Sequence, residues 1–281
     1  DTFRFFRMKR KDSATSSSPK KSPPTQPNRA PNTVVGLLLG AARLYFSIPA
    51  RIKAMFYLVW VAFLSLVAAV IPFDTEIYYF TKKHNLFNQY GVKIGWFWTL
   101  FMVGPYVWYS ARAIHRQATP IFKDLSRIAV ATGLWWTTIQ LFHRILAATS
   151  RCDTGSMMLS RAACATNGGK WLLGYDVSGH CFLMVYSILL MTEEAASYPA
   201  YMRAIKSRPA SEQKEMDAKV QLFYVGMASL HIFWDVQLVI STLYYHIMFD
   251  KVAGVAMAVG CWSLSYRILY KKGLLPQPVR Q

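Results

Sequence analysis

Long apolar runs constrain the fold of this chain more than any other feature. They follow a polar opening and recur to the C-terminus, and several approach the roughly 20 residues that a helix needs to cross a bilayer. Apolar residues make up 53% of the 281 residues, which exceeds the average for soluble domains. Because backbone polar groups in lipid must be satisfied internally, we expect an all-α polytopic membrane protein.

The apolar runs predict six transmembrane helices within a membrane domain that covers residues 55–272. The predicted spans are approximately 55–73, 96–110, 128–148, 178–192, 220–246 and 252–266. The preceding run is interrupted by Arg43 and stopped by Pro49, so we assign residues 33–54 to an interfacial or re-entrant helix. Residues 1–32 are basic and rich in Pro and Ser, which predicts a disordered cytosolic tail. Residues 273–281 form a C-terminal tail.

Basic residues are distributed unequally between the two sides of this predicted membrane domain. Of the 32 Lys and Arg residues, 24 fall in the tails and loops of one side, seven fall on the other, and Arg144 lies in a span. Cytoplasmic loops carry such an excess, so both termini are expected in the cytosol. The net charge of +18 therefore indicates orientation, and we expect no nucleic-acid partner.

A Ser178-Gly179-His180 sequence opens the fourth predicted span. Ser178 can cap the helix, and Gly179 lets backbone N–H groups approach an anion closely. An imidazole on the first turn, titrating near neutral pH, can donate a proton to a leaving oxygen. The alternative is a capped helix with an interfacial histidine.

The predicted topology brings His180 and His246 to the same, lumenal face. One imidazole can then attack phosphorus while the other protonates the departing oxygen. Asp176 is placed to orient His180, and Lys251 to neutralise phosphate charge. The sequence has no evident Mg²⁺ cage or zinc spacing, so neither a tightly held metal nor another cofactor is expected. Two unrelated interfacial histidines remain the alternative.

His231 and Asp235 form a second candidate pair, at i and i+4 inside the fifth span. His231 lies 15 residues before His246, roughly 22 Å along a helix, which is too far to share one phosphate with His180. We interpret this pair as a polar element that lines a lipid cavity.

Cys152 and Cys164 share one polar loop on the predicted lumenal side. In an oxidising compartment they can close a disulfide beneath the Ser-Gly-His helix. Free thiols are the alternative.

These residues together make the sequence similar to the fat storage-inducing transmembrane protein family. The resemblance rests on Tyr175-Asp176-Val177-Ser178-Gly179-His180 with Glu193-Glu194, on Tyr244-Tyr245-His246 followed by Lys251-Val252-Ala253-Gly254, on the Trp262 to Tyr266 region, on Tyr79 to Trp98 with Asn85 and Val92-Lys93, and on Gly273-Leu274-Leu275-Pro276. It covers most of the chain from about residue 55 onward.

The resemblance implies a helical bundle like that of the lipid phosphate phosphatases, in the endoplasmic reticulum membrane. It implies an acyl-CoA diphosphatase that uses His180 and His246 and cleaves fatty acyl-CoA to acyl 4'-phosphopantetheine and adenosine 3',5'-bisphosphate. It also implies binding of diacylglycerol and triacylglycerol and support of lipid droplet formation and lipid homeostasis.

The chain departs from the wider phosphatase pattern. It has no Lys-x₆-Arg-Pro motif and no Ser-Arg before His246, so the groups that cradle the phosphate are left open. One alternative is a non-catalytic protein that binds diacylglycerol or triacylglycerol and partitions neutral lipid into droplets. Another is a transporter that uses His231 and Asp235 as a relay, although the sequence lacks the repeat symmetry typical of such folds.

Overall fold

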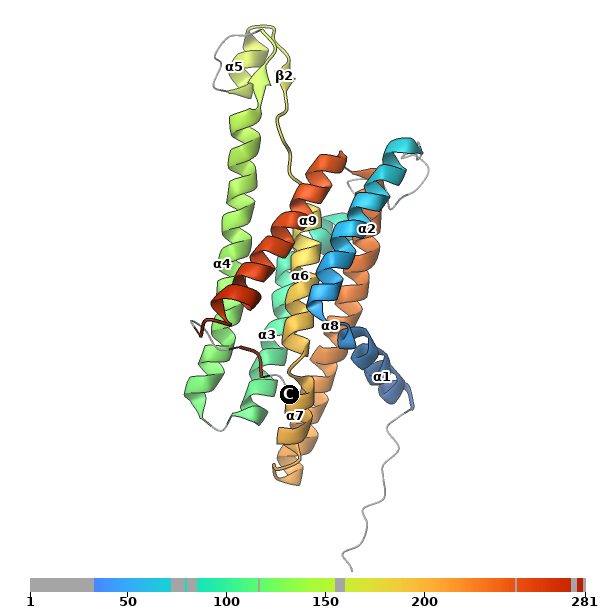
Figure 1. Cartoon of the computed structure of the whole chain (residues 1–281), viewed down its shortest axis with the longest axis vertical. Helices are drawn as coiled ribbons and strands as arrows, with labels where there is room; N and C mark the ends of the chain where they lie inside the picture. The colour runs from blue at the N-terminus through green and yellow to red at the C-terminus, as the bar shows by residue number, and fades with distance from the viewer. Residues whose placement is uncertain are drawn as a thin grey trace, which may run out of the picture.

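The described part of the chain is a helical bundle. The computed structural model describes residues 33–71, 79, 85–115, 117–154, 160–245, 247–273 and 277–279. Long helices lie side by side in one elongated molecule (Figure 1). Two paired strands of two residues each are the other regular elements among these residues, so the all-α expectation is confirmed. The predicted tail, residues 1–32, lies outside the described residues.

The helices follow the predicted apolar runs closely. Their bounds are α1 Thr33–Ser47, α2 Ala50–Val70, α3 Gly95–Ile114, α4 Ala118–Thr149, α5 Arg161–Thr166, α6 Gly179–Ala195, α7 Tyr198–Ile205, α8 Ala210–Tyr244 and α9 Met248–Trp262. Two π-helical segments, η2 Phe87–Val92 and η3 Ser263–Leu269, precede α3 and continue α9. Each of the six expected spans thus overlaps a helix over its described residues.

Among the described residues, three helices are long and apolar enough to cross a membrane. They are Ala50–Val70, Ala210–Tyr244 and the continuous segment Met248–Leu269. Helix α6 has 17 residues, slightly fewer than a membrane span usually needs.

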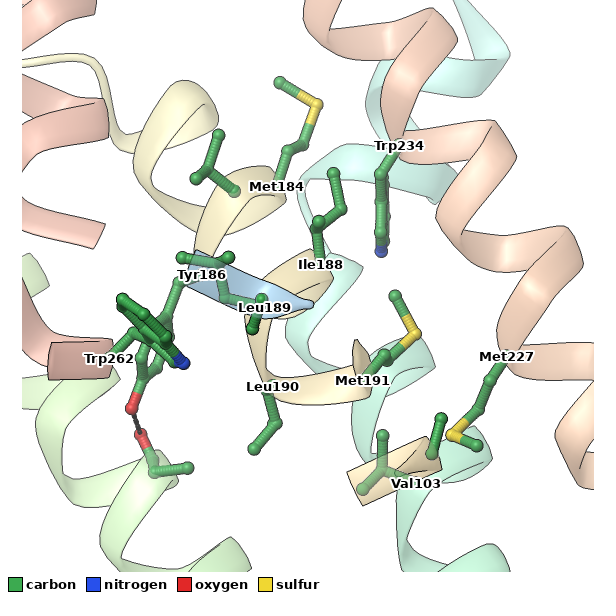
Figure 2. Close-up of a cluster of buried hydrophobic side chains, with 14 of the residues drawn as sticks. Val103, Met184, Tyr186, Ile188, Leu189, Leu190, Met191, Met227, Trp234 and Trp262 are labelled. Atoms are coloured by element: carbon green, nitrogen blue, oxygen red, sulfur yellow. Dashed lines mark hydrogen bonds between the residues drawn. The ribbon is translucent and has the colours of Figure 1, made fainter. Parts of the chain in front are cut away.

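Helix α6 forms the centre of the bundle. Every residue from Cys181 to Ala195 is buried, and the helix packs against α9, α8 and α3. Figure 2 shows its apolar side chains between Trp262 of α9 on one side and Met227 and Trp234 of α8 on the other. A helix that is apolar on all faces is expected to be enclosed in this way.

Several boundaries differ from the sequence prediction, and α4 begins at Ala118, ten residues before the expected span. Glu193 and Glu194, expected just beyond the fourth span, belong to α6 and are buried. Lys53, expected in the interfacial segment, lies in the first turn of α2 and is 5% exposed. Helix α8 begins at Ala210, ten residues before the expected span, because Pro209 and a helix-forming polar stretch precede the apolar run. This polar stretch extends α8 well beyond its apolar segment.

A small disulfide-bonded subdomain lies at the far end of α4, beyond the main bundle (Figure 1). Strand β1, Arg151–Cys152, pairs antiparallel with β2, Trp171–Leu172, and α5 lies between them in sequence. The bond joins Cys152 to Cys164, with Cα atoms 5.8 Å apart. The segment after β2 leads directly into α6.

Candidate active site

The start of α6 is a capped helix terminus. Ser178 is the N-cap residue, fully buried, and its hydroxyl accepts a hydrogen bond from the Cys181 backbone N–H at 3.3 Å. This bond satisfies one of the backbone donors that a helix leaves unpaired at its N-terminus. His180 follows on the first turn, where the positive end of the helix dipole favours an anion.

Helix α9 holds this terminus in place through backbone contacts. The Ser178 N–H donates to the Asp250 carbonyl at 3.0 Å. A Cβ atom on Gly254 would lie 2.5 Å from the Ser178 carbonyl oxygen, so only glycine permits the two helices to approach this closely. The beginnings of α6 and α9 therefore lie at the same end of the bundle.

The His180 ring is oriented by an asparagine from η2. His180 Nε2 lies 3.0 Å from Asn88 Oδ1, and the Asn88 backbone N–H donates to Asn85 Oδ1 at 2.7 Å. Both asparagines are buried. Because an amide oxygen only accepts hydrogen bonds, this contact places a proton on Nε2. Asn88 thus orients the ring of His180, the candidate proton donor.

A cavity of about 260 Å³ opens beside His180. Gly179 and Leu183 line it from α6, Trp135 and Ile139 from α4, and Val92 and Lys93 from the turn before α3. The Lys93 side chain is exposed, and its Nζ donates to Gln89 Oε1 at 2.7 Å. Lys93 therefore brings a positive charge to the cavity that contains the imidazole.

The other residues predicted at this end have different positions. Lys251 is 3% exposed and donates to the Thr242 carbonyl at 2.5 Å, and it does not line the His180 cavity. Asp176 lies half-buried in the extended segment before α6. His246 lies outside the described residues, between Tyr245 at the end of α8 and Ile247 at the start of α9 in the sequence.

His231 and Asp235 belong to a separate polar cluster between α1, α2 and α8. His231 Nδ1 lies 3.4 Å from Asp235 Oδ2, and His231 is fully buried. Lys53 Nζ lies 3.0 Å from His231 Nε2 and donates to Thr192 Oγ1 at 3.3 Å. The hydroxyls of two tyrosines, Tyr45 and Tyr57, both donate to the Asp235 carboxylate.

A third group of charged residues is buried at the opposite end of α6. Arg127 makes a bidentate contact with Glu194, at 2.9 and 2.8 Å, and a further bond to Asp124 at 2.6 Å. Tyr266 donates to Glu194 at 2.6 Å, and Trp262 donates to Glu193 at 3.0 Å. We call these residues the ionic cluster. Glu194 lies 14 residues from His180, about 21 Å along the helix, so the cluster is remote from the cavity.

Cys152, Asp153 and Cys164 have ligand atoms within 4.8 Å of one another, a spacing compatible with a metal site. The two sulfurs are joined in a disulfide, however, and a thiolate is the form that binds metal. This group is therefore a structural cross-link at the entry to α6.

Sequence reasoning assigned no role to Asn88 or Lys93, and it missed two partners of His231, Lys53 and Tyr45. No local spacing connects Asn88 to His180, which lies 92 positions later in the chain. Arg127 falls between the predicted spans 96–110 and 128–148, in a loop that the predicted orientation places in the cytosol, yet it lies on α4 and is 2% exposed. The sequence does contain a signal for this burial, because Arg127 directly precedes an apolar run. A charge at such a position is either exposed at the interface or paired internally.

Comparison with known proteins gives consistent matches. The model of the family described as "Fat storage-inducing transmembrane protein" matches residues 76–266. A Caenorhabditis elegans protein named acyl-coenzyme A diphosphatase FITM2 is 42% identical over 98% of both chains. Proteins of the same name from Drosophila melanogaster and Homo sapiens are 30% and 24% identical, over 90% and 70% of this chain and 67% and 75% of theirs. No solved structure matches the chain.

Proposed function

Because the chain belongs to the fat storage-inducing transmembrane protein family, we propose that it is a membrane-embedded hydrolase, an acyl-CoA diphosphatase. Its substrate is fatty acyl-CoA, and its products are acyl 4'-phosphopantetheine and adenosine 3',5'-bisphosphate. The observation that carries the proposal is the placement of His180 on the first turn of a capped helix, beside a cavity that also contains Lys93. The printed names of the relatives support the same activity.

The proposed reaction divides the work between two histidines. His246 attacks one phosphorus of the pyrophosphate, so that a P–N bond forms and the bridging P–O bond breaks. Doubly protonated His180 keeps its Nε2–H on Asn88 and donates its Nδ1 proton to the leaving phosphate oxygen. Water then attacks the phosphohistidine, the P–N bond breaks, and the proton released by water returns to His180. The sum adds one water across the P–O–P linkage.

Phosphate binding in this proposal relies on the α6 N-terminus and on Lys93. The positive end of the α6 dipole attracts an anion near Gly179, and the Lys93 ammonium stabilises charge that develops on the phosphate oxygens. Lys251 has a different role in this proposal, because its ammonium already binds the Thr242 carbonyl. It fixes the corner between α8 and α9 and thereby the chain on either side of His246.

We also propose six spans, with both termini in the cytosol and the His180 cavity in the lumen of the endoplasmic reticulum. The predicted division into a basic tail (1–32), an interfacial or re-entrant helix (33–54), a membrane domain (55–272) and a short C-terminal tail (273–281) is part of this proposal. Its support is the unequal distribution of Lys and Arg and the match between helices and apolar runs. The Cys152–Cys164 disulfide suits an oxidising lumen on the side of His180.

A second candidate function is the binding of diacylglycerol and triacylglycerol in support of lipid droplet formation, without catalysis. A membrane-facing pocket beside Asp235, lined mostly by apolar side chains, favours it. The two functions are separable, because the pocket and His180 lie on different helices and share no lining residue.

Acyl-CoA hydrolysis by purified variants tests the proposed activity. His180→Ala and His246→Ala should each lower turnover by orders of magnitude with the fold intact. His143→Ala is the matched control, because His143 is exposed on α4 and does not line the cavity. His231→Ala should affect stability more than turnover. Wild-type turnover in both His180→Ala and His246→Ala would contradict the mechanism and leave lipid binding as the function.

A further inference from the structure

A further pocket lies at the end of α6 opposite to His180. Its volume is about 500 Å³, within the range of small-molecule sites, about 300 to 1,000 Å³. The ends of α1 and α6, helix α7 and one residue of α8 line it. Helices α1 and α7 lie toward the lower end of the bundle, away from the disulfide-bonded subdomain (Figure 1). The pocket shares no lining residue with the His180 cavity or with the pocket beside Asp235.

This pocket lies at a membrane boundary. Helix α1 ends at Ser47, three residues before the start of α2, which is long and apolar enough to cross a membrane. Helix α6 ends at Ala195, about 22 Å along the helix from His180. Leu44 and Ile48, next to the pocket on α1 and just after it, are exposed apolar side chains. The pocket therefore borders the hydrocarbon at the level of the lipid headgroups.

Two arginines give the pocket its charge. Arg43 comes from α1 and Arg203 from α7, and both are exposed. No Asp or Glu lines the pocket, and neither arginine forms a salt bridge within the part of the chain that the structure describes. The Tyr198 hydroxyl accepts one hydrogen bond from Arg43, at 3.3 Å. Because a guanidinium has five N–H donors, most donors of both groups can bind a ligand.

Aromatic side chains form the floor of the pocket and position Arg43. Tyr198 and Tyr224 stack with ring centroids 4.1 Å apart, and Phe46 lies 5.3 Å from Tyr224. All three residues are buried. The Arg43 guanidinium lies over the Tyr198 ring, 5.2 Å from its centroid, which is a cation–π distance. One cation is therefore held in place above an apolar surface before a ligand arrives.

We propose that this pocket binds the headgroup of an anionic phospholipid, whose phosphate contacts Arg43 and Arg203 while its acyl chains lie along Leu44 and Ile48. A guanidinium suits phosphate oxygens because its planar fork donates two parallel hydrogen bonds. Basic pockets between membrane helices bind such headgroups. A soluble phosphate ester would leave the apolar border unused, and a neutral lipid would leave both charges unmatched. The proposal does not depend on the diphosphatase activity.

Native mass spectrometry of the purified full chain in detergent tests the proposal. The two probes are dioleoylphosphatidylglycerol, which is anionic, and dioleoylphosphatidylcholine, which has the same acyl chains and no net charge. The anionic lipid should bind at least about tenfold more tightly, and millimolar glycerol 3-phosphate should not displace it. Equal affinity for the two lipids would overturn the proposal. Displacement by glycerol 3-phosphate would overturn it in favour of a site for soluble phosphate esters.

Three variants locate the site. Arg43→Gln/Arg203→Gln should weaken phosphatidylglycerol binding about tenfold or more, because charge-assisted hydrogen bonds to the phosphate are lost. Arg51→Gln is the matched control, because Arg51 is exposed in the first turn of α2 and does not line the pocket. Ser47→Trp keeps both charges but fills the pocket, so it should also lose the lipid. Wild-type affinity in the double variant or in Ser47→Trp, or an equal loss in Arg51→Gln, would overturn the site.

Discussion

Replacing Arg127 by Met should destabilise the protein strongly, because it breaks the ionic cluster from one side. Arg127 is 2% exposed, and Glu194 is fully buried with both carboxylate oxygens bound by the guanidinium. The substitution preserves most of the side-chain volume but leaves the buried Glu194 carboxylate without its cation, whereas Asp124 keeps its contact with His115 at 3.1 Å. Removing one partner of a buried ion pair typically costs about 3 to 5 kcal/mol.

This cost can be measured as a shift of the unfolding midpoint in detergent. For a chain of this size, 1 kcal/mol corresponds to about 2 to 4 °C, so Arg127→Met should lower Tm by about 6 to 20 °C. The double variant Arg127→Met/Glu194→Met should recover part of the loss, because an apolar pair replaces the isolated buried charge.

An exposed ion pair on α8 provides the control for Arg127→Met. Lys219 and Glu215 are 2.6 Å apart on α8, with side chains 40% and 70% exposed. Lys219→Met should leave Tm unchanged, because exposed pairs of this kind contribute little. If Arg127→Met shifts Tm no more than Lys219→Met, or if the double variant is less stable than Arg127→Met, the reasoning about the ionic cluster is refuted.

Three further substitutions test the site and its support. Asn88→Ala should lower kcat about tenfold with little change in KM, since one hydrogen bond to the candidate proton donor is lost; equal kcat would contradict its positioning role. Gly254→Ala should destabilise by about 1 to 3 kcal/mol in thermal unfolding, whereas Gly260→Ala, with nothing within 4 Å of its Cβ, should not. Reducing the disulfide, or removing it in the Cys152→Ser/Cys164→Ser variant, should lower Tm because the disulfide-bonded subdomain loses its cross-link. An unchanged Tm would contradict this role.

The positions of the helices were predictable because the physical cause is local. A helix in lipid needs an apolar run of sufficient length, and such runs are visible in the sequence. The pairing of His231 with Asp235 was predictable for the same reason, because residues at i and i+4 share a helix face.

Contacts between distant segments were not predictable in this way. Lys53 meets His231 across 178 positions, and His180 meets Asn88 across 92. Periodicity within one helix does not reveal which face of another helix it will contact. Charge counting also treats every basic residue near a span as a loop residue, so it placed Lys53 and Arg127 at the surface when both are buried.

The central helix connects the candidate active site to the ionic cluster mechanically. Helix α6 has His180 on its first turn and Glu194 near its last, and every side chain from Cys181 to Ala195 is buried. Sliding or rotating α6 would therefore disrupt packed contacts along its whole length and stretch the bonds from Arg127 to Glu194. His180 is thus held in a fixed position before substrate arrives, which is what electrostatic preorganisation requires. Among the described residues that line the candidate site, the exposed Lys93 side chain is the group expected to adjust to a substrate.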